Sequence, residues 1–461
     1  MAETIKSGKD ITMGDIVKNV NERAAEGMHR MTHYRWVVLA ISVIMTIICN
    51  SDRANFGTAL PFIRQEMTMS NTEAGVLMSL FFFGYAFMQL PGGFITSKFG
   101  MRKTLAISII LTSCIVASLY MATSVSELKG MRLAIGIAEG PMTVGLIATI
   151  NNWFPAKEKG TATGIFIAGT KTGPLIVPPI CATVLALWGW REIFLVFALP
   201  GIIMGIVWFI MIRNHPEESR FPSKEEINYI ASADTDDSTQ KLKKKYNMRW
   251  LDRLIRAKKV QKLDTNKKLF TSWSLIGDSL AFAFMAGIVV IMMSWLPTYL
   301  VTVRHMSLGT MAFSAAAPFA GNVLGNIVGG WLGDHIFNKR RKPMMLLSAI
   351  STCITMNLLL NAPENPYILA LILFLCGFML SLGYNGFFSY PMGLVSKEKF
   401  PIAEGIMQTG GQFGGAIAPL VVGIILDAFG WNMVFTALAA GAIICFLFVL
   451  TLVEPVDDPL V

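Results

Sequence analysis

Six ionisable residues stand inside long apolar stretches of this sequence, where charged side chains are rare. A charge near the centre of a lipid bilayer costs about 2.5–3.5 kcal/mol even on forgiving scales, so such a residue usually faces a cavity or an oppositely charged partner. Carboxylates in such places can bind and release protons, and guanidinium or ammonium groups can hold anions. The six residues are Asp52, Arg53, Arg132, Glu139, Lys171 and Asp278.

Two pairs among these residues have informative spacing. Asp52 and Arg53 are adjacent, so on a helix their side chains point about 100° apart and cannot share one face. Either each pairs with a neighbouring helix, or Arg53 offers a planar fork to a carboxylate while Asp52 loads and releases a proton. Glu139 follows Arg132 by about two turns on the same side of a helix. This spacing suits a structural Arg–Glu pair, or a proton-binding Glu139 that Arg132 orders.

The elements that carry these residues are predicted to be membrane-spanning helices. The chain has 461 residues, of which 53% are hydrophobic and 15% charged, too few charges to cover a soluble domain. A helix needs about 20 apolar residues to cross a bilayer. Twelve such runs are present, approximately at 34–62, 75–96, 103–123, 130–153, 160–187, 193–212, 270–300, 310–333, 343–361, 367–390, 402–428 and 432–453.

A polar stretch at 213–269 separates the first six runs from the last six. We therefore expect an all-α membrane protein with two pseudo-symmetric six-helix bundles, at 34–212 and 270–453, joined by a cytoplasmic central loop. Short polar tails at 1–33 and 454–461 complete the chain, and the first apolar run continues into a full span, unlike a cleavable signal.

The net charge of +9 is explained by the membrane rather than by nucleic acid, because the basic residues lie mostly in alternate loops, as the positive-inside bias predicts. This placement puts both termini in the cytoplasm. The lysine and arginine residues of the outer loops are Arg64, Lys129, Arg191 and Arg304. The inner side carries the central loop and Lys98, Arg102, Lys103, Lys157, Lys159, Lys339, Arg340, Arg341, Lys342, Lys397 and Lys399.

The two halves also repeat a motif. The glycine-rich and then basic segments 93–103 and 329–342 follow the second and eighth runs, and duplicated halves of this kind hold substrate near the midplane. Both segments resemble the inner-loop pattern G-x-x-x-D-[RK]-x-G-[RK]-[RK] of the major facilitator superfamily. Ser97 replaces the usual aspartate in the first copy, while Asp334 keeps it in the second.

A closer resemblance is to the anion:cation symporter branch of that superfamily, which includes bacterial galactonate, glucarate and hexuronate transporters. It is carried by Asp52-Arg53-Ala54-Asn55, by Tyr85 with the following Gln-Leu-Pro-Gly-Gly, by Arg132, and by the stretches 136–141 and 152–160. The resemblance covers nearly the whole chain. It is specific for the branch and not for one substrate.

The resemblance implies roles for several residues. Glu139 would be the coupling carboxylate beside Arg53, and Tyr85 would bond substrate or, alternatively, only pack between helices. Gln408 stands where galactonate transporters carry asparagine, so a different substrate is expected. The expected proton-coupling residues are Asp52 and Glu139, and the expected substrate-binding residues are Arg53, Tyr85, Arg132, Thr170, Lys171, Asn385, Ser389 and Gln408.

Lys171 and Asp278 lie outside the family pattern. Lys171 follows Thr170, which occupies the place where sugar-acid members often carry glutamine. Lys171 would add a second positive charge for a dicarboxylate, pair with a carboxylate across the cavity, or extend toward the membrane surface. Asp278 is either a second acid or a structural cap.

These observations predict a secondary transporter, not an enzyme, that imports a small organic anion, such as a sugar acid, by proton symport through alternating access. We expect it in a bacterial inner membrane, as a monomer, with substrate, protons and lipid as its partners. No cofactor or metal is expected, because the sequence has neither CxxC spacing nor a phosphate-binding loop. Alternatives are a proton-antiporting exporter of amphiphilic or aromatic compounds, a sodium-coupled anion transporter and a non-transporting sensor.

Overall fold

The structure is a computed structural model that describes residues 31–232, 252–253, 255–338, 340–396 and 399–456. Most of the predicted N-terminal tail, part of the central loop, Lys339, Lys397 and the last residues of the C-terminal tail lie outside the described residues. Within them, eleven helices are long and apolar enough to cross a membrane, or up to twelve if one bent pair is counted as a span. The predicted all-α membrane fold is confirmed.

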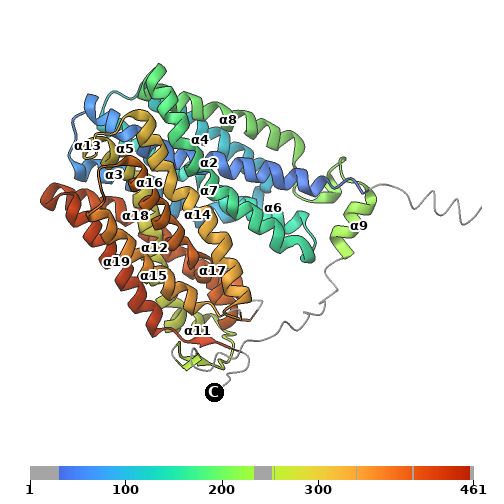
Figure 1. Cartoon of the computed structure of the whole chain (residues 1–461). Coiled ribbons are helices and arrows are strands. Elements are labelled where there is room, and N and C mark those ends of the chain that lie inside the picture. The colour runs from blue at the N-terminus through green and yellow to red at the C-terminus, as the bar shows by residue number, and fades with distance from the viewer. Residues whose placement is uncertain (1–30, 233–251, 254, 339, 397–398, 457–461) are drawn as a thin grey trace, which may run out of the picture.

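The first half forms one bundle (Figure 1). Serine side chains start two of its helices, because Ser70 and Ser124 each accept a bond from the third backbone N–H and close a capping box with Glu73 and Glu127. The bundle contains α2 (Tyr34–Glu66), α3 (Asn71–Phe99), α4 (Met101–Ser118), η1 (Leu119–Met121), α5 (Val125–Glu139), α6 (Pro141–Trp153), α7 (Ala156–Leu187) and α8 (Trp190–Met211).

The second half forms a matching bundle. Its elements are α12 (Trp273–Ser294), α13 (Leu296–Thr302), α14 (Leu308–His335), α15 (Lys342–Leu360), α16 (Pro366–Leu382), α17 (Tyr384–Leu394), α18 (Phe400–Phe429) and α19 (Trp431–Thr451).

Four predicted spans are broken or bent. The fourth, seventh and tenth spans break at Gly140, Trp295 and Gly383. Prolines follow the first two breaks closely and suit the first turn of a new helix, where no backbone donor is needed. The second span bends by 50° near Pro91, a residue that removes a helical hydrogen bond.

The two bundles meet at one end of the molecule and diverge at the other (Figure 1). We call these the closed end, where α13 lies, and the splayed end, where α2 begins and α19 stops. Gly57 lies so close to α12 that an added Cβ would be 2.5 Å from the Met293 carbonyl oxygen. On the other side, the Ser79 hydroxyl accepts a bond from the Leu420 backbone at 3.1 Å.

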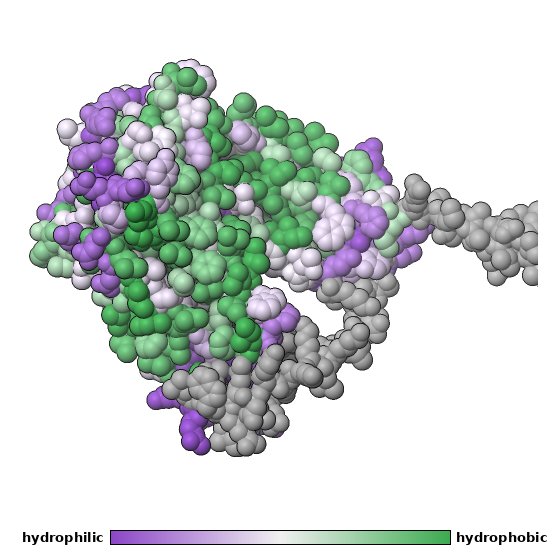
Figure 2. All heavy atoms as spheres, in the orientation of Figure 1, coloured by the Kyte–Doolittle hydropathy of each residue, from purple (hydrophilic) through white to green (hydrophobic). Residues whose placement is uncertain are grey.

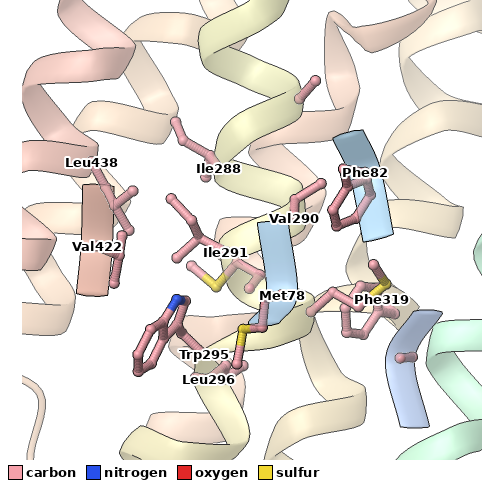
Figure 3. Close-up of a cluster of buried hydrophobic side chains, with 14 of the residues drawn as sticks. Met78, Phe82, Ile288, Val290, Ile291, Trp295, Leu296, Phe319, Val422 and Leu438 are labelled. Atoms are coloured by element: carbon pink, nitrogen blue, oxygen red, sulfur yellow. The ribbon is translucent and has the colours of Figure 1, made fainter. Parts of the chain in front are cut away.

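Apolar side chains from both bundles fill the contact between them (Figure 3). Met78 and Phe82 of α3 approach Ile291 and Val290 of α12, with Phe319 of α14 beside them. The outward surface is also apolar along the middle of both bundles, and polar residues gather at the ends (Figure 2). An apolar belt between polar ends is what a bilayer requires of a spanning protein.

The predicted central loop is partly structured and is attached to both bundles. It contains η2 (Pro216–Glu218), α9 (Lys224–Ser232), β1 (Ala257–Lys258) and α11 (Asn266–Thr271). Glu226 of α9 accepts bonds from the backbone of Tyr34 and Arg35 at 2.8 and 3.1 Å. These hydrogen bonds tie α9 to the first helix.

The other end of the central stretch is tied to the second bundle. β1 pairs in parallel with β2 (Glu454–Pro455) near the end of the chain. Arg340 donates both Nε and Nη2 to the Asp252 carboxylate. Because these partners lie far apart in the sequence, periodicity alone did not indicate the contacts.

Candidate functional site

A cavity of about 150 Å³ lies between the two bundles, and both contribute to its wall. Positive charge comes from the first bundle, through Arg53 and Lys171, and amide groups come from both. Four phenylalanines supply aromatic surface. The lining residues are Asn50, Arg53, Phe82, Thr170, Lys171, Pro174, Phe282, Ala286, Val289, Val290, Met293, Phe319, Tyr384, Phe388, Gln408, Gly411, Gln412 and Gly415.

Arg53 of α2 is bound to Glu139, the last residue of α5. Arg53 donates Nε and Nη2 to the Glu139 Oε1 atom at 3.0 and 2.5 Å. Glu139 is fully buried, and its Oε2 atom has no hydrogen-bond partner among the described residues. The guanidinium lies 4.5 Å from the centre of the Tyr85 ring, a favourable cation–π distance. The ion pair therefore connects the cavity wall to the buried core of the first bundle.

Close helix packing places this pair. Gly136 of α5 lies so close to the Phe81 carbonyl of α3 that an added Cβ would clash with its oxygen. Small residues at such a point let helix backbones approach closely. One turn after Gly136 the helix reaches Glu139 and breaks, which directs the carboxylate toward α2.

Asp52 and Arg132 are buried near the ion pair. Asp52 is 3% exposed and accepts a bond from Asn55 at 3.3 Å. Its charge interacts with both Glu139 and Arg132. Arg132 lies 4.5 Å from the Phe56 ring centre and donates to the Leu77 carbonyl oxygen at 3.4 Å. The four residues form a buried cluster with two acids and two bases.

The direct Arg132–Glu139 pair suggested by the helical spacing is not formed among the described residues, since Glu139 is bonded to Arg53 instead. Arg132 is buried and is absent from the cavity wall. Among the described residues it forms no hydrogen bond to either acid, so it acts on them through its charge.

Tyr85 is also away from the cavity wall. Its hydroxyl donates to the Thr143 hydroxyl at 2.8 Å, and the residue is 1% exposed. In this conformation its ring faces Arg53. The packing interpretation of Tyr85 fits this geometry.

Thr170 and Lys171 lie on the cavity wall, as does Gln408. The Lys171 Nζ atom is 4.5 Å from the centre of the Tyr384 ring, which belongs to the opposite bundle. Lys171 forms no ion pair within the part of the chain that the structure describes. It thus points into the cavity and not toward the membrane surface.

Asn385 and Ser389, both on α17, are not among the cavity-lining residues. Asn385 donates to the Asn326 carbonyl oxygen at 3.1 Å, and Ser389 donates to the Asn385 carbonyl oxygen at 2.5 Å. Both side chains satisfy backbone groups here.

The cavity wall includes Asn50 and four phenylalanines, which our candidate set lacks. Asn50 precedes Arg53 by about one turn, the spacing of neighbours on one helix face, so its position carried a usable signal. The aromatic residues carried none, because apolar side chains are equally common on lipid-facing and cavity-facing surfaces of a membrane helix.

Comparisons with known proteins agree with this architecture. The family model of the major facilitator superfamily matches residues 42–399 and 305–460, and the chain belongs to this family of membrane transporters. It is 28% identical to a D-galactonate transporter of Escherichia coli O6:H1, over 89% of this chain and 93% of that protein.

A second relative and a solved structure extend this finding. The chain is 25% identical to a probable galactarate/D-glucarate transporter of Bacillus subtilis, over 93% of each chain. Its fold matches a bacterial homologue of the human lysosomal transporter Spinster, solved in an inward-facing, occupied conformation, with a TM-score of 0.72, 15% identity and coverage of 90% and 96%. The predicted resemblance to sugar-acid transporters of this superfamily is confirmed. Members of this family are membrane transporters and not enzymes.

Proposed function

We propose that this protein imports a small organic anion, in the class of sugar acids, together with protons. The observation that carries the proposal is the Arg53–Glu139 pair. It joins an anion-binding fork on the cavity wall to a buried carboxylate that can be neutralised by a proton. The names of the two relatives support the substrate class.

Coupling follows from competition for Arg53. While Glu139 is ionised, its oxygen occupies two guanidinium donors of Arg53. A proton on Glu139 removes that charge, so the fork becomes free to bind a substrate carboxylate in the same planar geometry. Loss of the proton restores the Arg53–Glu139 bond and releases the substrate. Asp52, which interacts with Glu139 through its charge, is the second proton carrier in this scheme.

The splayed conformation suits the release step. Arg53 is engaged by Glu139 while the bundles are apart at the end where α2 begins. If this end faces the cytoplasm, as the charge distribution of the loops predicts, the structure corresponds to a carrier that is open inward. Alternating access would then require the closed end to open and the splayed end to close. On this scheme the protein acts as a monomer in the bacterial inner membrane.

Uptake into proteoliposomes tests the proposal. Labelled aldonates, aldarates, uronates and aromatic acids would be offered with an inward proton gradient, and one acid should accumulate above equilibrium. Arg53→Ala should abolish this uptake. Glu139→Gln should retain exchange of substrate across the membrane but lose accumulation driven by protons.

The matched control is Glu73→Gln, which removes a surface carboxylate bonded to Lys129 and should leave uptake unchanged. Accumulation that requires a sodium gradient, with no response to protons, would contradict proton symport.

The four phenylalanines of the wall favour a second candidate, an exporter of aromatic compounds. Uptake that is limited to aromatic acids and is driven by an outward proton gradient would identify this antiporting exporter.

A further inference from the structure

A second buried acid lies in the other bundle. Asp278 of α12 is 0% exposed, and neither oxygen of its carboxylate has a hydrogen-bond partner among the described residues. An ionised carboxylate in such a place costs several kcal/mol unless it is paired. The environment therefore favours a proton on Asp278.

Within the part of the chain that the structure describes, no cation compensates Asp278 from the helices packed around it. The charge that acts on it is that of Glu404 on α18, which is of the same sign. The other titratable neighbours, Tyr390 on α17 and Cys445 on α19, are also neutral or negative groups, and both interact with the charge of Asp278. The charged groups of α2 and α11 have no such effect on Asp278 among the described residues. They are Arg35, Asp52, Arg53, Arg64, Glu66, Lys267 and Lys268.

Close packing keeps water away from Asp278 on one side. Gly410 of α18 lies against the Ser279 carbonyl, where a Cβ would not fit, and the Ser279 hydroxyl donates to the Ile406 carbonyl oxygen at 2.7 Å. Glu404 is only half-buried, and its Oε2 atom has no hydrogen-bond partner among the described residues. Its side chain interacts with Gln408, which lines the central cavity.

We propose that Asp278 and Glu404 form a second proton-binding site, in the second bundle between α12 and α18. Asp278 holds the proton, and Glu404 passes it between Asp278 and the cavity side of α18, where Gln408 lies. The inference extends the proposed proton coupling, since it places a proton-binding site in each bundle. Transfer needs only a proton from water, so charge and atoms balance when Asp278 goes from carboxylate to carboxylic acid.

Infrared spectroscopy of the purified protein tests this without any substrate. A protonated buried carboxyl group gives a carbonyl stretch that is separate from the amide bands. Asp278→Asn should remove one such band at neutral pH. Asp264→Asn, at an exposed acid paired with Lys268, is the control and should remove none.

A second variant keeps the test decisive if Asp278→Asn does not fold. In Glu404→Gln the Asp278 band should remain, but its shift on transfer to heavy water should be slower than in the wild type. The proposal would be overturned if a folded Asp278→Asn protein kept every carboxyl band. It would also be overturned if the Asp278 band of Glu404→Gln shifted in heavy water as fast as in the wild type. Neither result bears on Arg53 and Glu139, so failure of this site and failure of proton symport remain distinguishable.

Discussion

Arg53 binds Glu139 with two donors of one planar group, and this geometry gives a prediction at the scale of a single side chain. Arg53→Lys keeps the charge but loses the fork. One charge-assisted hydrogen bond contributes about 1.5–3 kcal/mol, so the KM for the substrate should rise roughly tenfold to a hundredfold. Initial rates of uptake into proteoliposomes measure it. Arg191→Lys, at an exposed pair with Glu66, should leave KM unchanged.

Lys171 gives a second prediction, which concerns selectivity. It is a second positive charge on the cavity wall, so it should matter more for a substrate with two carboxylates than for one with a single carboxylate. Lys171→Gln should therefore lower the affinity for aldarates by a larger factor than the affinity for aldonates. Competition assays against one labelled substrate provide the comparison. Equal losses for both classes would show that Lys171 does not read the second carboxylate.

The candidate residues were predictable from sequence to different extents. Charge inside an apolar run singled out Arg53, Glu139, Asp52 and Lys171, because charge in lipid is costly wherever it stands. The partner of Glu139 was not fixed by spacing, since a two-turn separation suggested Arg132 whereas the break at Gly140 turns Glu139 toward α2. Contacts between helices decide such pairings, and periodicity within one helix does not contain them.

At the scale of the element, the contact between α3 and α5 gives a third prediction. Gly136→Ala would force these helices apart, since its Cβ meets the Phe81 carbonyl. Overpacking of this kind costs roughly 1–3 kcal/mol, and it would also move Glu139 away from Arg53. The melting temperature in detergent and the rate of uptake should both fall. Gly130→Ala on the same helix meets nothing within 4 Å and is the matched control.

The β1–β2 attachment gives a prediction about pH. Burial raises the pKa of Glu454 to about 7, although the backbone N–H groups of Arg341 and Lys342 bond its carboxylate. A raised pKa means that the protonated acid stabilises the folded state, fully below the unfolded pKa near 4.5. The contribution, roughly 3 kcal/mol at most, is lost as the pH rises toward 7. The protection of the β1 amides, corrected for the intrinsic rise of the exchange rate with pH, should thus be lower at pH 8 than at pH 5, and Glu454→Gln should abolish this difference in protection.

The spans were predicted to within a few residues, and their breaks were not. Apolar run length is a property of the local sequence, which is why α8 ends at Met211 and α19 at Thr451, close to the expected limits. Gly383, where the tenth span breaks, lies close to the Met344 carbonyl of another helix, a contact that the local sequence does not contain. The pairing of β1 with β2 likewise joins segments that lie far apart in the chain.

At the scale of the whole molecule, the twofold repeat predicted two bundles with a site between them, and the cavity has walls from both. The conformation was not predictable. A carrier that alternates between two arrangements has one sequence for both, so the choice between them rests on small differences in contacts at the two ends.

The contacts at the closed end give the last prediction. Asp427 of α18 accepts four bonds from α3, from the backbone and side chain of Asn71 at 3.0 and 2.8 Å and of Thr72 at 2.8 and 2.6 Å. These bonds join the bundles only while that end is closed. Asp427→Ala should therefore favour conformations open there, and a loss of about 1–2 kcal/mol would change their population by roughly fivefold to thirtyfold.

Spin labels at Trp188 and Tyr367, exposed residues near the closed end of each bundle, would measure this distance in a protein whose exposed Cys114 is replaced. The Asp427→Ala distribution should gain a longer component, and Asp264→Ala should not. Because Asp427 touches neither the cavity nor the ion pair, a longer distance with unchanged substrate affinity in the inward-open state would place the effect on the conformational equilibrium. An unchanged distribution would mean that the other contacts between the bundles, such as those of Ser79 with Leu420 and of Met78 with Ile291, hold this end closed without Asp427.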